Sequence, residues 1–461
     1  MTTISCAVNF DFLTSDWINA GKAQVRSTRL APGFEFAFVY PISRPTALDS
    51  VRLFGTPTSG NTQISGAQDA GLLIEEVSTS GSVPYLLARN QSGVDFLLLA
   101  GQIVKGGKQN RGINLDVLVS AGASTQIPVT CVEQGRWSGG PRTRFQHGGI
   151  EPLSVRTMKM RDAHACRRAD RAVVADQLAV WDEIMSMERA VGARSASHDL
   201  LATLSHSRSQ RASRADAPTD FADPGARVEA PRTDLSQELR AIEEELRALE
   251  EEVHRITSAL ANAPIPGADE STSDREALLH RHGCCERQAA RLRTRRTAIL
   301  RDGPGGPGVV SLESIKAADN AAQGACGMLV FMRDEFIAGD VFADPAWFQH
   351  VYHDLRDSAL LSWDVVRRTK AGAARTRQHG CDAEAQARGI MQETVTGEWT
   401  ERRTVGHGTN LLLTHPTLDG AMIAGHDRTP LHMLLGTRTV PSVFSGSRGS
   451  RRRDLRNFPM E

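Results

Sequence analysis

The sequence predicts an α+β fold: a mainly antiparallel β-sheet domain with packed helices, interrupted by an inserted antiparallel coiled-coil hairpin. Three observations lead to this prediction. Short apolar runs separated by turn residues fill the first third of the chain, as in a β-meander. Apolar residues at helical spacing follow from Arg168 to Ala190. A heptad repeat begins at Leu235, and α/β segments resume after it.

The chain has 461 residues, enough for two or three domains or for one large domain with an insertion. Composition and periodicity divide it into six segments. They are an N-terminal β-segment at 1–46, a first half of the α+β domain at 47–208, a disordered linker at 209–232, the coiled-coil hairpin at 233–302, a second half of the domain at 309–435 and an Arg-rich disordered tail at 436–461.

The formal net charge is zero, so no overall field favours a nucleic acid or a membrane as partner. The seven cysteines are odd in number and show no disulfide spacing, which favours a reducing cytoplasm. The chain starts without a basic, apolar leader, and no apolar run approaches the roughly 18 residues of a membrane span. We therefore expect a cytoplasmic protein. The arginine tail suits a solubilising role or weak, unspecific contact with nucleic acid.

The meander leads into a predicted hairpin of two strands, Gly112–Val119 and Thr125–Val132. Each strand has an apolar face, and both faces must lie on one side of the sheet. The register that achieves this sets Val117 opposite Ile127 and Leu115 opposite Val129. It leaves a short loop in which Gly122 can take a positive φ.

This register brings two polar clusters together and so predicts the best candidate site of the chain. They are Lys108, Gln109, Asn110 and Arg111 before the hairpin and Glu133, Gln134, Gly135, Arg136 and Trp137 after it. Arg111 falls opposite Glu133, and Lys108 falls opposite Arg136.

Two interpretations of this site stay open. In the first, the cationic and amide side chains bind a phosphate or carboxylate, Glu133 acts as a catalytic base or orients a guanidinium, and Trp137 stacks on a ring. In the second, Arg111 and Glu133 form a cross-strand ion pair that only fixes the end of the hairpin.

The heptad segment predicts two helical arms. The first arm, from Asp234 to Arg255, has eight acidic and three basic residues, and the second, from Asp274 to Arg301, has eight basic and three acidic residues. Opposite charge and a short break at Pro264–Gly267 favour an antiparallel hairpin. We expect this arm to dock a protein partner.

The second half of the domain begins with a predicted hairpin and a helix. The hairpin comprises Cys326–Met332 and Phe336–Val341, and Asp344-Pro345 is typical of a helix start that leads to Arg368. Further strands are predicted at 393–404, 410–414, 421–424 and 431–435.

No metal site is predicted. His280, His282, Cys284 and Cys285 are metal-ligand types, but on a heptad helix they point in different directions. Asp176, Asp182 and Glu183 lie on one predicted helix and fit solvated charges. The sequence does not reveal whether the protein binds a cofactor.

Several segments resemble one family, the ARG and rhodanese-phosphatase-superfamily-associated protein domain, where ARG stands for ADP-ribosylglycohydrolase. The resemblance runs from about 47 to 208 and again from 309 to 435. It rests on Leu97–Arg111, Pro128–Trp137, Ala175–Ile184, Ala338–Phe342 and Leu431–His432.

The chain departs from the family at Ala100 and Gln102, where the family tends to carry acidic residues. If those carboxylates act in a reaction or bind a metal, this member would be impaired. The family's name implies a link to ADP-ribose or phosphate metabolism through neighbouring proteins, which is association and not mechanism.

The leading hypothesis is an accessory or binding protein that holds an anionic, nucleotide-like or ADP-ribose-like ligand at the hairpin end. One alternative is a hydrolase or transferase acting on ADP-ribose, nucleotide or phosphate compounds. Another is a scaffold that docks a protein partner through the coiled coil at 233–302. The residues do not decide whether the protein is an enzyme.

Overall fold

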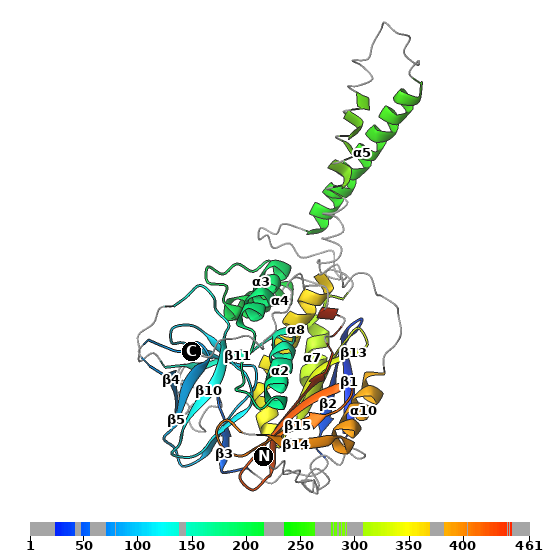
Figure 1. The fold of residues 1–461 in the computed structure, drawn as a ribbon. Helices are drawn as coiled ribbons and strands as arrows, with labels where there is room; N and C mark the ends of the chain where they lie inside the picture. Colours follow the sequence, from blue (N-terminus) through cyan, green and yellow to red (C-terminus); the bar gives the residue numbers. More distant parts are fainter. Residues whose placement is uncertain are drawn as a thin grey trace, which may run out of the picture. The chain divides into compact units, whose positions relative to one another are not determined.

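The computed structural model describes a chain of mixed helices and antiparallel sheets, in agreement with the predicted α+β class (Figure 1). The described residues are 24–41, 48–55, 71–78, 80–137, 144–215, 235–262, parts of 278–292, 308–368, 382–402, 404–439, 441 and 443–444. The chain divides into two compact units. The main unit comprises Met1–Ser213 and Leu312–Glu461, and the inserted unit comprises Arg214–Ser311.

An eight-stranded antiparallel sheet forms one side of the main unit. Its strand order is β1 (Gln24–Ala31), β2 (Phe34–Tyr40), β12 (Gly327–Met332), β13 (Glu335–Phe342), β17 (Pro430–Thr437), β16 (Leu418–Ala424), β15 (Thr409–Thr414) and β14 (Glu398–Arg402).

Both faces of this sheet are covered, as the sequence of β2 requires. Its phenylalanines alternate with Glu35, Ala37 and Val39, so each face receives apolar side chains. On one face Phe34 stacks on Trp363 of α8 (Pro345–Arg368), with ring centroids 5.0 Å apart. On the other face Ala37 and Val39 share a buried cluster with residues of α10 (Ala383–Thr396).

Two smaller sheets form the other side of the main unit. The six-stranded sheet has the order β11 (Gln146–Ile150), β7 (Gln102–Lys105), β8 (Arg111–Ile113), β10 (Ser124–Cys131), β5 (Tyr85–Asn90) and β4 (Leu72–Glu76). The three-stranded sheet has the order β3 (Val51–Leu53), β6 (Asp95–Leu98) and β9 (Val117–Val119), with β3 and β6 parallel.

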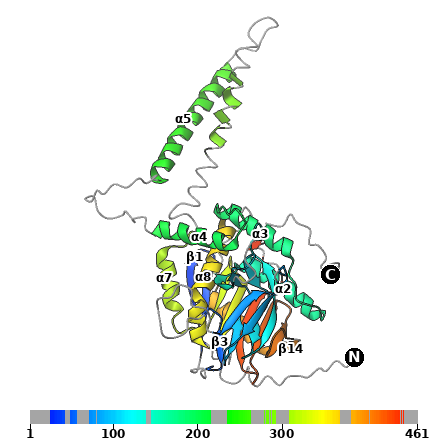
Figure 2. The same cartoon turned by 90° about the vertical axis from the view of Figure 1, so that its left-hand side faces the viewer.

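Helix α2 (Leu153–Arg168) lies between the sheets (Figure 1). Its Ala163 and Cys166 pack into the apolar cluster of the smaller sheets, and the helix also contacts β13, β16 and β17. Figure 2 shows α3 (Gln177–Val191) and α4 (Leu200–Ala215) together at one end of the main unit, where they share a cluster with α2 and α8. Helix α7 (Leu312–Ala321) contacts β1.

The helix predicted at 168–190 is wrong at its start. Helix α2 ends at Arg168, and α3 begins only at Gln177. Asp176 is the N-cap of α3, because its carboxylate accepts hydrogen bonds from the backbone N–H groups of Leu178 and Ala179. Helix α2 itself was not predicted, since charged residues interrupt its apolar spacing although most of the helix is buried.

The predicted hairpin register is also wrong. Val129 lies opposite Ile113, and Cys131 lies opposite Arg111, two residues away from the expected pairing. The strand predicted at Gly112–Val119 is divided, because β8 pairs with β10 while β9 pairs with β6. A shift of two residues keeps every side chain on its expected face.

The division of this strand has a physical cause in the residues between β8 and β9. The carboxylate of Asp116 accepts a hydrogen bond from the N–H of Ala100 and contacts His432, so the chain turns away from β10 there. The predicted positive φ of Gly122 is confirmed, at 70°.

The inserted unit contains α5 (Leu235–Asn262), which covers the first predicted heptad arm. Ile242 and Leu246 of α5 are buried against Ala289 and, at the edge of the cluster, Leu292. Residues 263–277 and 293–307 lie outside the described part, as do His280 and Cys284.

Two predicted segment boundaries are wrong by a few residues, because a helix and a strand continue past them. Helix α4 continues to Ala215, so the beginning of the linker predicted at 209–232 is helical, and β17 continues to Thr437. Residues 1–23, 216–234 and 445–461 lie outside the described part. Among the described residues, no helix is both long enough and apolar enough to cross a membrane.

The division into two units predicts that the main unit folds without the insertion. We expect a variant that lacks Asp234–Arg301, bridged by a short Gly-Ser linker, to unfold cooperatively, with a midpoint within a few degrees of the full chain in differential scanning calorimetry. A matched deletion of 382–397 removes α10, and we expect it to abolish cooperative unfolding because the core of the eight-stranded sheet is then exposed. Loss of cooperativity in the first variant would contradict the division.

Candidate functional site

Two of the polar clusters in the main unit are candidates for a functional site. The Arg111 cluster comprises the predicted site residues Lys108, Gln109, Asn110, Arg111, Glu133, Gln134, Arg136 and Trp137. The central network comprises Asp116, Arg156, Asp340 and His432 with the adjacent pair Glu151 and Lys159.

The structure brings the predicted site residues together around Glu133. Its carboxylate is nearly buried and accepts hydrogen bonds from the N–H of Asn110 at 3.1 Å and from the hydroxyl of Ser197 at 3.0 Å. Arg136 donates two more from one guanidinium, at 2.7 and 2.9 Å. The carboxylate is therefore fully engaged by four donors.

These donors control the protonation of Glu133. Burial alone would raise the pKa of its carboxyl, but the hydrogen bonds from Arg136, Asn110 and Ser197 hold the pKa below its ordinary value. Glu133 is thus anionic at neutral pH.

The amide side chains of the cluster fix the chain segments to one another. Gln109 donates to the carbonyl of Gln134 at 3.2 Å, and Asn110 donates to the carboxylate of Asp199 at 3.0 Å. Asp199 precedes α4 and accepts from the N–H of Leu201. The turn before β8, the segment after β10 and the start of α4 are therefore held as one piece.

Arg111 has a different environment from the rest of the cluster. It is completely buried, and its Nη1 donates to the side-chain oxygen of Gln109 at 3.0 Å. Its Nε and Nη2 have no hydrogen-bond partner, and no carboxylate of the described residues lies within ion-pair distance of it. Burial lowers the pKa of the guanidinium, and the nearby Cys131 and Glu76 oppose this shift.

Trp137 lies against both cations of the cluster. Its ring centroid is 5.5 Å from Cζ of Arg111 and 5.4 Å from Nζ of Lys108, within the range of cation–π contacts. Trp137 is 48% exposed, so one part of its indole faces solvent.

The cross-strand ion pair of the second interpretation does not form between Arg111 and Glu133. Glu133 pairs instead with Arg136, three residues further along the same segment. The predicted opposition of Lys108 and Arg136 likewise fails, since the register is shifted and the guanidinium of Arg136 reaches the carbonyl of Gly107 at 2.8 Å.

The central network joins the sheets across α2. Arg156 of α2 donates two hydrogen bonds to Asp340 of β13, at 3.0 and 2.6 Å. His432 of β17 contacts Asp340 at 3.3 Å and Asp116, which precedes β9, at 2.8 Å. All four side chains are at least nine-tenths buried.

The charges of this network shift the pKa values of its members. Burial alone would raise the pKa of Asp340, but the Arg156 guanidinium and the hydrogen bond with His432 hold it well below its usual range. Burial alone would lower the pKa of His432, but Asp116 and Asp340 raise it to about 9. The histidine is therefore a cation at neutral pH.

A second buried pair lies beside the network. Lys159 of α2 contacts Glu151 at 2.7 Å and donates to the carbonyl of Ile113 at 3.2 Å. Burial raises the pKa of Glu151 and lowers that of Lys159, each against the effect of its partner. A Cβ on Gly112 would lie 1.6 Å from Oε1 of Glu151, so this close approach requires glycine.

Sequence reasoning did not select the central network. Its signal was present, because His432 is the one titratable residue of β17, and Asp340 lies among apolar and glycine residues in the inner part of β13. Both also lie in segments that carry the family resemblance. Without the fold, however, nothing placed them beside a helix that was itself not predicted.

The structure also locates the two departures from the family pattern. Ala100 contributes its backbone to the network, with its N–H bound to Asp116 and its carbonyl 3.4 Å from Nη2 of Arg156. Gln102 lies elsewhere, where its amide nitrogen contacts the carbonyl of Phe54 and Nδ1 of His147, each at 2.9 Å. Among the described residues, no group of three or more His, Cys, Asp or Glu side chains could hold a metal ion.

The contrast between Arg111 and Arg156 can be tested by the same substitution at both. We expect Arg156→Met to lower the free energy of unfolding by about 3–5 kcal/mol, because it leaves Asp340 buried without its partner. We expect Arg111→Met to leave it unchanged or to raise it by about 1 kcal/mol, because the guanidinium has no carboxylate to abandon. Urea denaturation of both variants measures this, and equal losses would contradict the difference in compensation.

The raised pKa of His432 predicts a pH dependence of stability. The folded-state pKa of His432, about 9, lies above the unfolded value near 6.5. Its protonation therefore contributes about 3 kcal/mol to the free energy of unfolding below pH 6.5, and this contribution is lost as the pH rises through 9. We expect the stability difference between wild type and His432→Gln to shrink by about this amount between pH 6.5 and 9.5 in urea denaturation. A difference that stays constant over this range would refute a charged His432.

Comparison with known proteins identifies the family of the chain. Searches of curated proteins and of solved structures found no match. The sequence model of one family, the ARG and Rhodanese-Phosphatase-superfamily-associated Protein domain, matches residues 42–225 and 310–435. The two matched stretches carry both polar clusters, and the gap between them falls in the inserted unit. The chain therefore belongs to the ARG and rhodanese-phosphatase-superfamily-associated protein domain family.

Proposed function

We propose that the protein is a cytoplasmic accessory or binding protein that holds an anionic, nucleotide-like or ADP-ribose-like ligand at the Arg111 cluster. One observation carries the proposal. The guanidinium of Arg111 is completely buried, yet two of its nitrogens have no hydrogen-bond partner and no carboxylate of the described residues pairs with it.

A buried cation in this state is costly. An unsatisfied buried donor costs about 1–3 kcal/mol, and an unpaired charge costs more. The same stretch of chain satisfies Glu133 with four hydrogen bonds, so the lack of partners at Arg111 is not shared by the buried carboxylate of the cluster. A ligand anion would supply the missing charge and acceptors.

The free atoms of Arg111 have the geometry for an oxyanion. Nε and Nη2 lie on the same edge of the guanidinium, while Nη1 is held by Gln109. That edge donates two parallel hydrogen bonds, the arrangement that suits a phosphate or carboxylate. Lys108 adds a second positive charge beside the same indole.

Trp137 contacts Arg111, so we expect its indole to move when a ligand reaches the guanidinium. Because Arg111 has no exposed surface, the atoms that cover it must shift before a ligand oxygen can reach the guanidinium, and the indole is in contact with it. The exposed part of the indole can then stack on the base of a nucleotide. Binding should therefore change the fluorescence of Trp137.

The alternative is a hydrolase or transferase that acts on ADP-ribose, nucleotide or phosphate compounds with Glu133 as catalytic base. The environment of Glu133 favours binding over catalysis, since its lowered pKa and four donors make it a weak base. Burial also raises the pKa of the neighbouring Cys131 thiol, which disfavours it as a nucleophile. Turnover that is lost in Glu133→Gln while binding persists would support the enzyme.

A second part of the proposal concerns the inserted unit, which we propose is an antiparallel coiled-coil hairpin that docks a protein partner. Gln288 donates to Glu245 at 2.9 Å, and Arg281 pairs with Glu252 at 2.8 Å. Moving seven residues forward on α5 thus moves seven residues backward on the other segment, which is the relation that antiparallel helices produce. The opposite charges of the two arms favour the same arrangement.

Ligand binding is the first test of the proposed function. We expect ADP-ribose, AMP or inorganic phosphate to raise the unfolding midpoint and to change the Trp137 fluorescence. A ligand at about 100 times its Kd adds about 2.7 kcal/mol to the free energy of unfolding. We expect Arg111→Met to stay folded and to lose both responses.

Two control variants isolate the site. Arg89→Met removes an arginine of the same sheet that is 46% exposed and paired with Glu75, and it should bind like the wild type. Trp137→Phe identifies the part of the signal that comes from Trp137 among the six tryptophans. No response to any of the three compounds, or equal binding by Arg111→Met, would refute the proposed ligand site.

A further inference from the structure

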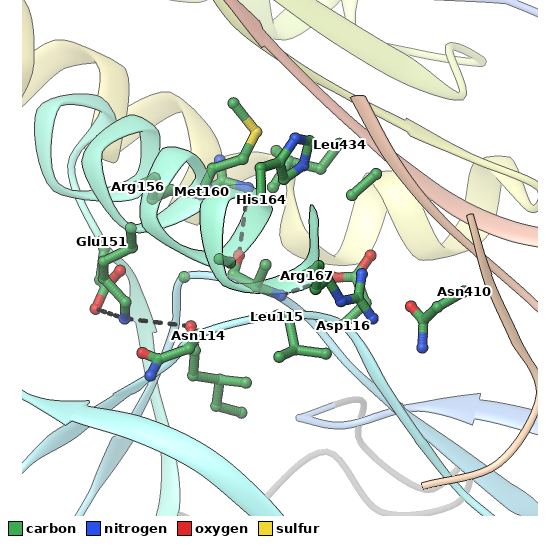
Figure 3. A pocket seen from close by; sticks show the side chains of 16 residues that line it. Asn114, Leu115, Asp116, Glu151, Arg156, Met160, His164, Arg167, Asn410 and Leu434 are labelled. Atoms are coloured by element: carbon green, nitrogen blue, oxygen red, sulfur yellow. Dashed lines mark hydrogen bonds and ion pairs between the residues drawn. The ribbon is translucent and has the colours of Figure 1, made fainter. Parts of the chain in front are cut away.

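A small cavity lies beside the central network, between α2 and strands of both sides of the main unit (Figure 3). Its volume is about 20 Å³, which is room for about one particle of the size of a water molecule. Of the sixteen lining residues, all but Ala421 are buried. The occupant of this cavity would be sealed inside the protein.

Seven polar atoms of the lining residues have no hydrogen-bond partner. Four are donors, Nε of Arg156, Nε and Nη2 of Arg167 and Nδ2 of Asn410; the others are Oε2 of Glu151, an acceptor, and the two ring nitrogens of His164. All five side chains are more than nine-tenths buried. In Figure 3 Glu151 and Asn114 lie at one end of the cavity, and Arg167 and Asn410 lie toward the other.

The lining carries an excess of positive charge. Its cations are Arg156, Lys159 and Arg167, and its carboxylates are Asp116 and Glu151, which leaves one positive charge over. The groups behind the lining do not remove the excess, because Asp340 is matched by the protonated His432, and Asp419 is paired with Arg168 at 2.7 Å. One negative charge would neutralise the site.

We propose that this cavity binds one small monovalent anion, of the size of chloride or bromide, at the end lined by Arg167 and Asn410. A polyatomic phosphate exceeds the volume, and a water molecule would leave the excess charge in place. The ion joins α2 to β15 and so stabilises the packing of the eight-stranded sheet on the helix. This site is separate from the Arg111 cluster and does not depend on the ligand there.

The test compares the full-length protein in sodium chloride and in sodium gluconate at equal ionic strength. We expect an unfolding midpoint that is higher in chloride by about 2 °C or more, since gluconate is too large to enter. Crystals grown in bromide should show an anomalous scattering peak inside the cavity. This second measurement uses the wild type and does not depend on the folding of any variant.

A matched pair of variants separates the ion from general salt effects. Asn410→Asp places a carboxylate of nearly the same shape in the lining and supplies the missing charge itself, so we expect the chloride dependence to vanish. Asn320→Asp adds the same charge on the exposed side of α7 and should keep the dependence. A water molecule in place of the bromide peak, or equal midpoints of the wild type in the two salts, would overturn the proposal.

Discussion

The buried chain of charges from Arg156 through Asp340 and His432 to Asp116 is the interaction on which the rest of the main unit depends. It connects α2, the eight-stranded sheet and the segment before β9 through hydrogen-bonded pairs of side chains that are at least nine-tenths buried. Isolated in an apolar interior, each of these groups would cost several kcal/mol. Together they favour the one arrangement in which every charge has its partner.

The backbone around this chain is built to allow the close approach. A Cβ on Gly101 would lie 2.6 Å from Nε of Arg156, and a Cβ on Gly112 would collide with Glu151. Gly112 directly follows Arg111, and Gly101 directly precedes β7, the strand that leads to Lys108. The requirement for small residues at the network and the position of the candidate ligand site are therefore two consequences of one stretch of sequence.

Arg111 and Arg156 show how a buried charge with a carboxylate partner differs from one without. Arg156 has a bidentate carboxylate partner, whereas Arg111 has one amide and an indole. A protein retains an uncompensated buried charge at the cost of stability, and such sites are typical of binding and catalysis. Membership of the ARG and rhodanese-phosphatase-superfamily-associated protein domain family is compatible with both binding and catalysis, so only Arg111 itself favours an anionic ligand at its cluster.

The sequence by itself determined the α+β class, most strands of both halves, the first heptad arm and the convergence of Lys108–Arg111 with Glu133–Trp137, because alternation, periodicity and clustered polar residues are local signals. Only the tertiary structure decided that β8 and β9 belong to different sheets, that Glu133 pairs with Arg136, and that α2 is buried with its charges. Those outcomes depend on partners distant in sequence, such as His432 for Asp116 and Asp340 for Arg156. A local pattern shows that a charge is present, but only packing decides which opposite charge it meets.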